Sequence, residues 1–313
     1  MTIKPGSPLI SIQTILGLQK SKKITQANVI IIDEYSDNLE NIKKILKFKG
    51  LPFLPSDRIN FECGDFDKKI NDGLDSFEKN QNKLAPTFFL LDPFGISGIK
   101  LCTIKRIMNM EKTEILLNFM YNSLQRWVNH PNEKIQNIYD EYFGGDEWRK
   151  CKGRYLHERE QKLISIFRNQ CKKFSKYVYP FRLNFPNKNQ TYYYLFHLTN
   201  HWRGCSLMKD SFAKFNDGKC EYAGEKYQSN LFEPMEEKDK KENFKNQLID
   251  FYKGKTIKCV NIFEGFIDET DLLLSEIKRM LKKLEKEKKI FVKAFDNRKR
   301  RGGFKNNDLI SFS

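Results

Sequence analysis

The sequence predicts an α/β fold with a largely parallel sheet, followed by a small C-terminal domain of helices and a basic hairpin. Two observations carry this prediction. Short apolar runs alternate with segments of helical periodicity through the first half of the chain, which is typical of right-handed crossovers with helices on both faces of a sheet. A charged stretch without periodicity then separates this part from a helix and a basic turn near the C-terminus.

The predicted strands of the first half are short and apolar. A helix over residues 8–18 precedes the first of them, 28–33, which we expect to be buried on both faces because it is an almost continuous apolar run. Further strands are expected at 59–62, 87–91 and 114–119, with helices at 38–48, 66–77 and 98–108.

An antiparallel hairpin is expected next. A long amphipathic helix over 155–174 is followed by strand-like runs at 177–183 and 192–198, which a polar loop joins. A parallel sheet that ends in such a hairpin is the order of elements in the class I S-adenosylmethionine-dependent methyltransferase fold. The sequence therefore predicts a methyltransferase-like, Rossmann-like domain over residues 1–220.

The C-terminal part is predicted to be a winged helix-turn-helix-like domain over residues 242–313, after a charged linker at 221–241. A helix over 242–252 and a second over 271–288, which Thr270 caps, carry regular apolar positions. A strand at 289–295, a basic turn with two glycines and a return strand near Phe304 follow. A helix followed by a basic hairpin is typical of the end of a winged helix.

Composition narrows the class of partner. The 313 residues carry a formal net charge of +16, which favours partners with phosphate groups, nucleic acid first, although a lysine- and asparagine-rich composition can also be background. The seven cysteines are scattered without a C-x-x-C spacing, so we expect neither a zinc site nor a redox pair. Without a long apolar run, we expect a cytoplasmic protein that does not enter the membrane.

Asp92, Pro93 and Phe94 are the candidate catalytic residues. They follow the strand at 87–91 directly, and open α/β sheets bind ligands at the carboxyl ends of their strands. An Asp at this point accepts hydrogen bonds from a target amine, and an aromatic ring after it stacks on a substrate base. The alternative is an ordinary turn in which Asp92 caps local amides.

Asp33, Asp65 and Phe66 are the candidate residues for an adenosine cofactor. Asp33 ends the first strand, where such folds bind ribose hydroxyls, and Glu34 is its rival for that role. Asp65 follows the next strand and can accept from an adenine amino group, with Phe66 beside the ring. Either acid can equally be a helix cap or a solvated loop charge.

A cationic turn is the candidate nucleic-acid contact. It consists of Arg298, Lys299, Arg300 and Arg301, and further basic residues lie on the helix before it. A solvated charged face is the alternative interpretation. We expect the four histidines to have structural or solvent roles and Trp202 to belong to the core, and we place the segment 208–210 in a loop on the substrate side.

Several motifs together resemble one known family. Thr87-Phe-Phe-Leu-Leu-Asp-Pro-Phe-Gly, Ile115-Leu-Leu-Asn-Phe-Met-Tyr-Asn-Ser with Arg126, Phe143-Gly-Gly-Asp-Glu-Trp, and Gly204 with Met208-Lys209-Asp210 look like the three-Cys-motif partner proteins of bacteria and archaea. The resemblance implies a methyltransferase-like fold with a winged-helix-like C-terminus. It also implies a separate partner that carries three cysteines and resembles radical S-adenosylmethionine enzymes. Asp92-Pro93-Phe94-Gly95 is also similar to the motif of tRNA guanine N2-methyltransferases.

One departure from that family affects the cofactor. Family members have a strand and a glycine loop, Asp-x-Phe-Ala-Gly-x-Gly, upstream of a Gly-Ser-Pro that matches Gly6-Ser7-Pro8, and here the sequence begins after it. That loop would hold the methionine part of S-adenosylmethionine. Two hypotheses follow: an S-adenosylmethionine-dependent methyltransferase of an amine on a nucleic-acid base, and a non-catalytic nucleic-acid-binding adaptor that retains the fold.

Overall fold

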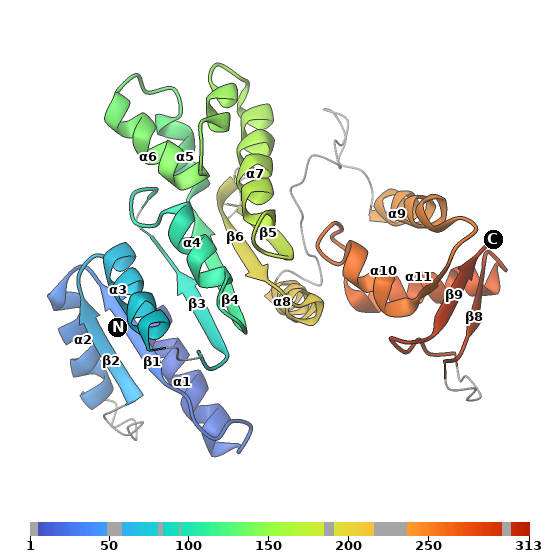
Figure 1. Ribbon diagram of the computed structural model, residues 1–313, viewed down its shortest axis with the longest axis horizontal. Coiled ribbons are helices and arrows are strands. Elements are labelled where there is room, and N and C mark those ends of the chain that lie inside the picture. Colours follow the sequence, from blue (N-terminus) through green and yellow to red (C-terminus); the bar gives the residue numbers. More distant parts are fainter. Residues whose placement is uncertain are drawn as a thin grey trace. The chain divides into compact units, whose positions relative to one another are not determined.

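The computed structural model describes residues 6–48, 58–80, 84–93, 95–184, 191–215, 237–295 and 302–313. The chain divides into two compact units, Met1–Lys83 and Leu84–Ser313 (Figure 1). The first unit contains a parallel strand pair, and the second contains a mixed sheet and a C-terminal antiparallel sheet. The predicted α/β class and the mixed sheet are therefore confirmed.

The first unit is a small β-α-β arrangement around an apolar cluster. Its elements are α1 (Ser7–Lys20), β1 (Val29–Asp33), α2 (Ser36–Phe48), β2 (Ile59–Cys63) and α3 (Phe66–Lys79). β1 and β2 are parallel, and Ile31 packs with Ile12 and Leu39. The prediction that both faces of the first strand are buried is wrong, because the cluster forms on the face of Ile31 while Ile30, on the opposite face, is 62% exposed.

The second unit is built on a four-stranded sheet in the order β3-β4-β6-β5. β3 (Thr87–Leu91) and β4 (Thr113–Phe119) are parallel, and β5 (Tyr177–Asn184) and β6 (Thr191–Thr199) form the predicted antiparallel hairpin. β6 also pairs antiparallel with β4. The carboxyl ends of β3 and β4 and the start of β6 therefore meet at one edge of the sheet.

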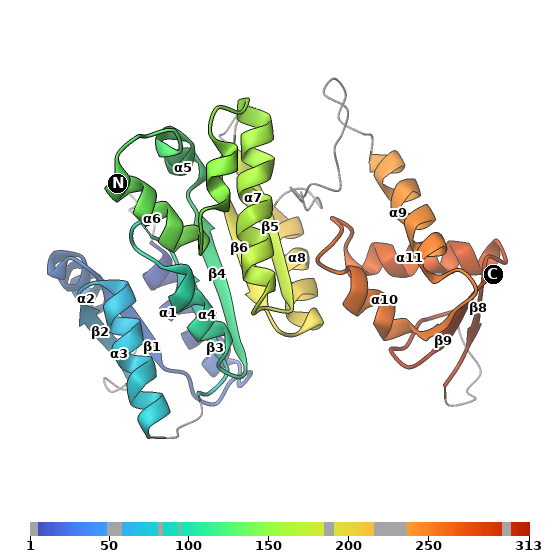
Figure 2. The ribbon, with the colours of Figure 1, turned by 45° about the horizontal axis from the view of Figure 1, so that its top comes forward.

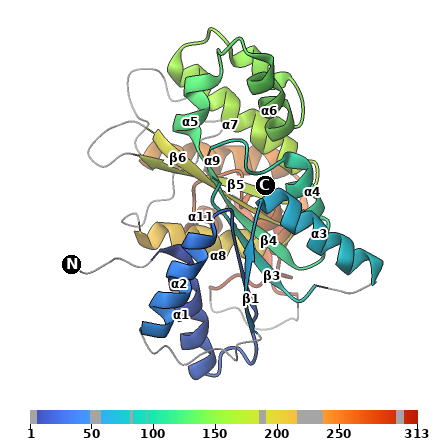
Figure 3. The same cartoon turned by 90° about the vertical axis from the view of Figure 1, so that its left-hand side faces the viewer.

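Different helices cover the two faces of this sheet (Figures 2 and 3). They are α4 (Leu101–Met108), α5 (Tyr121–Trp127), α6 (Glu133–Phe143), the short η2 (Glu147–Cys151), α7 (Leu156–Lys172) and α8 (Trp202–Phe215). On one face the ring of Phe167 in α7 lies 4.9 Å from that of Phe119 in β4. On the other, Phe212 in α8 stacks on Phe181 in β5 at 4.1 Å. Aromatic side chains thus make up much of both cores.

The C-terminal elements form a winged helix. They are α9 (Glu237–Tyr252), β7 (Thr256–Lys258), α10 (Cys259–Phe266), α11 (Leu274–Lys286), β8 (Ile290–Lys293) and β9 (Leu309–Phe312), and the strand order is β7-β9-β8. The return strand begins at Leu309, later than the predicted Phe304. Thr270 does not cap α11: its hydroxyl accepts from the Leu272 amide at 3.2 Å in the preceding turn.

Lys209 joins α8 to the winged helix. The segment 208–210 is helical, so the predicted substrate-side loop is wrong, and Lys209 is fully buried. Its ammonium group donates to the carbonyl oxygens of Ile267, Thr270 and Leu272 at 2.9, 2.6 and 2.6 Å. Because Ile267 is the C-cap of α10, the cation lies where the helix dipole favours positive charge.

A second buried link connects α7 with the turn after α10. Asp268 is 2% exposed, and its carboxylate accepts from the Val178 amide at 2.9 Å and from Lys172 at 2.8 Å. Arg168 lies 3.4 Å from the same carboxylate. Trp202 is 7% exposed and belongs to the apolar core that continues from β5 into the winged helix, which confirms its predicted core role.

None of the helices in the described ranges is long and apolar enough to cross a membrane.

Candidate functional site

Asp92 lies at the sheet edge where β3 and β4 end. β3 pairs in parallel with β4, and Leu91 is opposite Leu117. Asp92 follows Leu91 and Asn118 follows Leu117, so these two residues are neighbours. The Asn118 side-chain amide donates to Asp92 Oδ1 at 2.7 Å. Because a carboxylate only accepts hydrogen bonds, this contact fixes the amide nitrogen of Asn118 toward Asp92.

The other end of the Asn118 amide is a buried acceptor. Within the described residues, Asn118 Oδ1 has no hydrogen-bond partner although it is inaccessible to solvent. A buried acceptor without a partner costs about 1–3 kcal/mol, so such groups are uncommon and call for an explanation. The acceptor that a donating ligand can reach at this edge is therefore the exposed carboxylate of Asp92, which the Asn118 amide holds in place.

Tyr193 completes this edge from the start of β6. Burial, and then the negative charge of Asp92, raise the pKa of Tyr193. Because Tyr194 is opposite Phe119, Tyr193 lies at the same end of the sheet as Asp92. Its raised pKa keeps the phenol a neutral hydroxyl that can donate.

The loop after Asp92 turns back on itself beside α5. Gly95 donates to the carbonyl oxygen of Pro93 at 3.0 Å and has φ +88°, a conformation that favours glycine. A Cβ on Gly98 would meet Pro93 at 3.3 Å. The loop thus holds Pro93 tightly, whereas Phe94 lies outside the described residues.

Asp33 and Asp65 lie at the corresponding edge of the first unit. β1 and β2 end opposite each other at Asp33 and Cys63, and the amide of Gly64 donates to the Asp33 carbonyl at 3.0 Å. Both carboxylates have local partners: Asp33 accepts from the Tyr35 amide at 2.9 Å, and Asp65 accepts from the Lys68 amide at 2.8 Å as the N-cap of α3. Phe66, the first residue of α3, is half-buried. Their roles toward a cofactor stay a prediction.

The exposed face of α11 carries a basic stripe. Arg279, Lys282, Lys283 and Lys286 are all exposed and follow the spacing i, i+3, i+4, i+7, while Ile277, Leu281 and Leu284 of the same helix are buried. Lys283 has a long ion pair of 3.9 Å with Glu287. A row of cations along one side of a helix can contact successive phosphates of a nucleic-acid backbone.

The wing lies beside this stripe. A Cβ on Gly302 would come within 3.7 Å of Lys282 Nζ, so the end of the wing reaches the exposed face of α11. The predicted cationic turn, Arg298, Lys299, Arg300 and Arg301, lies outside the described residues. Lys286 is a candidate contact that sequence reasoning missed, although its position seven residues after Arg279 could have revealed it.

Two further residues of the sheet edge, Asn118 and Tyr193, were also missed. Asn118 interrupts the apolar run that starts at Ile115, and that interruption was the available signal. The histidines were predicted to have structural or solvent roles. His197 is fully buried with its Nε2 3.2 Å from Glu114, and in the part of the chain that the structure describes no group of His, Cys, Asp and Glu could hold a metal ion.

The mixed sheet and the helix-and-hairpin C-terminus define this chain as an α/β protein with a C-terminal winged-helix domain. Residues 222–294 match the model of the family described as GMT-like wHTH domain. That range contains α9, β7, α10, α11 and β8. No curated protein and no solved structure matches the chain.

Proposed function

We propose that this protein binds nucleic acid through its winged-helix domain. The observation that carries the proposal is the stripe of Arg279, Lys282, Lys283 and Lys286 on the exposed face of α11, with the wing beside it. Winged and helix-turn-helix domains place their recognition helix against the groove and backbone of a duplex. The net charge of +16 strengthens the attraction over a longer range.

The test is duplex binding by fluorescence anisotropy at several salt concentrations. Changing Lys282→Ala removes one cation from the stripe, so the slope of log affinity against log salt should fall by about 1. Lys134→Ala, an exposed lysine of α6, is the matched control and should leave the slope unchanged. Equal slopes for wild type and Lys282→Ala would contradict a phosphate contact at this stripe.

A second candidate function is methyl transfer from S-adenosylmethionine to an amine of a nucleic-acid base. Its support is the exposed carboxylate of Asp92 at the carboxyl end of β3, which the Asn118 amide holds in place and which can accept from and orient an amino group. Asp33, Asp65 and Phe66 would hold the adenosine part of the cofactor. In this proposal the chain is methyltransferase-like in fold and works with a separate three-Cys-motif protein.

Methyl transfer to RNA separates this candidate from a non-catalytic adaptor. Asp92→Ala should lower the rate about 100-fold, because the target amine loses its orientation. Asp146→Ala, whose side chain is 80% exposed, is the control. Failure of the wild-type chain to bind S-adenosylmethionine in calorimetry would favour the adaptor.

A further inference from the structure

The sheet of the winged helix has one face that no described element covers. Burial alternates from Ile290 to Phe295: Ile290 and Ala294 are 1% and 9% exposed, while Phe291 and Phe295 are 62% and 64% exposed. Successive residues of a strand point to opposite faces, so the ring of Phe291 in β8 belongs to the outer face. Phe295 lies in the turn just after β8, and its ring is exposed as well. Two large exposed aromatic residues on one short segment are uncommon on a surface without a ligand.

Strand register shows which residues accompany the rings. Phe291 is opposite Ser311 of β9, and Ser311 is opposite Thr256 of β7. The hydroxyl groups of Thr256 and Ser311 lie 2.8 Å apart, which confirms that they share this face. The next row of the same face contains Lys293, Leu309 and Lys258.

The charge of this face is entirely positive. The two rows contain Lys258 and Lys293, both exposed, and no acidic residue. Among the described residues, neither lysine has a carboxylate partner. Exposed rings between unpaired cations are the composition of a surface that tracks a phosphate backbone and stacks on its bases.

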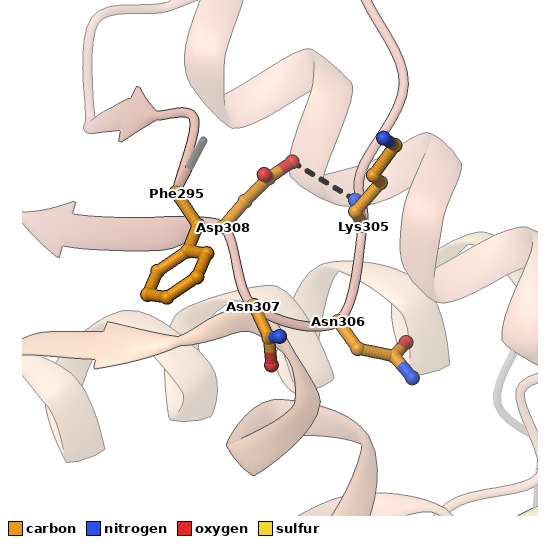
Figure 4. A pocket seen from close by; sticks show the side chains of 5 residues that line it. All are labelled: Phe295, Lys305, Asn306, Asn307 and Asp308. Carbon is orange, nitrogen blue, oxygen red and sulfur yellow. Dashed lines mark hydrogen bonds between the residues drawn. The ribbon is translucent and has the colours of Figure 1, made fainter. Parts of the chain in front are cut away.

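A pocket lies at the end of this face, beside Phe295. It has a volume of about 400 Å³ and is lined by Phe295 and by the turn Lys305, Asn306, Asn307 and Asp308 (Figure 4). The side-chain amides of Asn306 and Asn307 have no hydrogen-bond partner within the described residues. Asparagine amides both donate and accept, so they match the edges of unpaired bases.

The turn that forms the pocket is held firmly. The buried carboxylate of Asp308 accepts from the Lys305 amide at 2.9 Å. The carbonyl oxygens of Asp308 and Asn306 accept from the amides of Cys259 and Val260 at 2.8 and 2.9 Å. The side chains of Asn306 and Asn307 therefore extend from a turn whose backbone is fixed by hydrogen bonds.

We propose that this face binds unpaired bases of a single-stranded nucleic acid. Phe291 and Phe295 stack on bases, Lys258 and Lys293 contact phosphates, and Asn306 and Asn307 contact the edge of the base beside Phe295. Bases within a duplex are stacked on their neighbours and cannot use these rings. The inference rests on the proposed nucleic-acid binding and adds a second surface to it, apart from the stripe on α11.

The experiment compares a fluorescein-labelled oligouridylate with a labelled duplex of the same length, using the full chain. Phe291→Ala and Phe295→Ala should each weaken oligouridylate binding about tenfold, the effect of losing one stacked base, and leave duplex binding unchanged. Phe295→Trp should retain binding. Tyr155→Ala removes a ring that is 85% exposed outside the winged helix and should change neither affinity.

The outcomes separate this inference from the proposed function. Duplex binding by wild type together with no oligouridylate binding, or with oligouridylate binding that both Phe variants retain, overturns the inference and leaves the proposed function standing. Binding of neither nucleic acid overturns both. If the Phe variants bind both nucleic acids as wild type does but sediment with a different molecular mass, the face is a contact between copies of the chain and the inference is overturned.

Discussion

Glu114 connects β4 with the end of β6 and the start of α8. Its carboxylate lies 3.2 Å from His197 Nε2 and accepts from the Thr199 hydroxyl at 3.0 Å. A Cβ on Gly204, in the first turn of α8, would overlap this carboxylate, so a larger residue there would displace the Glu114 side chain. The hydrogen bond with His197 lowers the pKa of Glu114.

This lowered pKa makes stability depend on pH in a defined direction. A carboxyl group whose pKa is depressed by folding stabilises the protein above its unfolded pKa, near 4.5, and that contribution is lost as the pH falls through the lower folded value. We therefore expect Glu114→Gln to reduce the free energy of unfolding at pH 7, and the difference from wild type to shrink below pH 4.5. Urea unfolding of wild type and Glu114→Gln across this pH range measures the difference in free energy of unfolding. A difference that grows as the pH falls would contradict the assignment.

At the same scale, sequence could locate Asp92 but not its neighbours. The apolar run before Asp92 predicts a strand end, and that placement depends only on local pattern. Asn118 contacts Asp92, and Tyr193 comes to the same end of the sheet, through strand pairing between distant segments, and no local pattern encodes which strands become neighbours. For Asp33 and Asp65 the structure shows the local hydrogen bonds of the alternative interpretation, which also leave acceptor capacity for a ligand.

Among the elements, α8 shows why helical pattern alone is insufficient. Its charged residue Lys209 occupies a position that faces the core, so the segment does not have a clean apolar stripe. The reason is tertiary: the carbonyl groups at the end of α10 surround the ammonium group. A buried lysine of this kind is not visible as a core residue in sequence.

Lys209→Met tests this contact between elements. Methionine fills a similar volume but leaves three buried carbonyl groups without their donor, so the free energy of unfolding should fall by about 3 kcal/mol. Lys214→Met, an exposed position on the same helix, is the control and should change it little. Urea unfolding gives both values. Equal stability of the two variants would show that solvent replaces the ammonium group.

For the whole molecule, sequence predicted the α/β class, the hairpin and the C-terminal helical domain with most of their strands. It missed the helices α5, α6, η2, α8 and α10, the short strand β7, and the division of the chain at Lys83. The predicted domain limits stay a prediction, and the charged linker lies largely outside the described residues. The continuous core from β5 into the winged helix depends on pairings over long sequence distances, for which local periodicity carries no signal.

Asp268 tests how far this second unit behaves as one body. Asp268→Ala removes the acceptor of the Val178 amide and one of the two carboxylate partners of Arg168 and Lys172, so the free energy of unfolding should fall by about 1–3 kcal/mol. Hydrogen exchange should become faster at the Val178 amide in β5 as well as in the winged helix. Asp146→Ala is the exposed control. Faster exchange confined to the winged helix would contradict coupling through this carboxylate.

The strand order β7-β9-β8 has a practical consequence for anyone who expresses the C-terminal part by itself. β9 is the middle strand of that sheet, yet it lies at Leu309–Phe312, beyond the matched range 222–294. A gene fragment cut at the limits of the match would lose the strand to which both neighbours bond and would expose apolar residues that Ile310 and Phe312 normally cover. Cloning boundaries should therefore extend to Ser313 and be tested with and without β5 and α8.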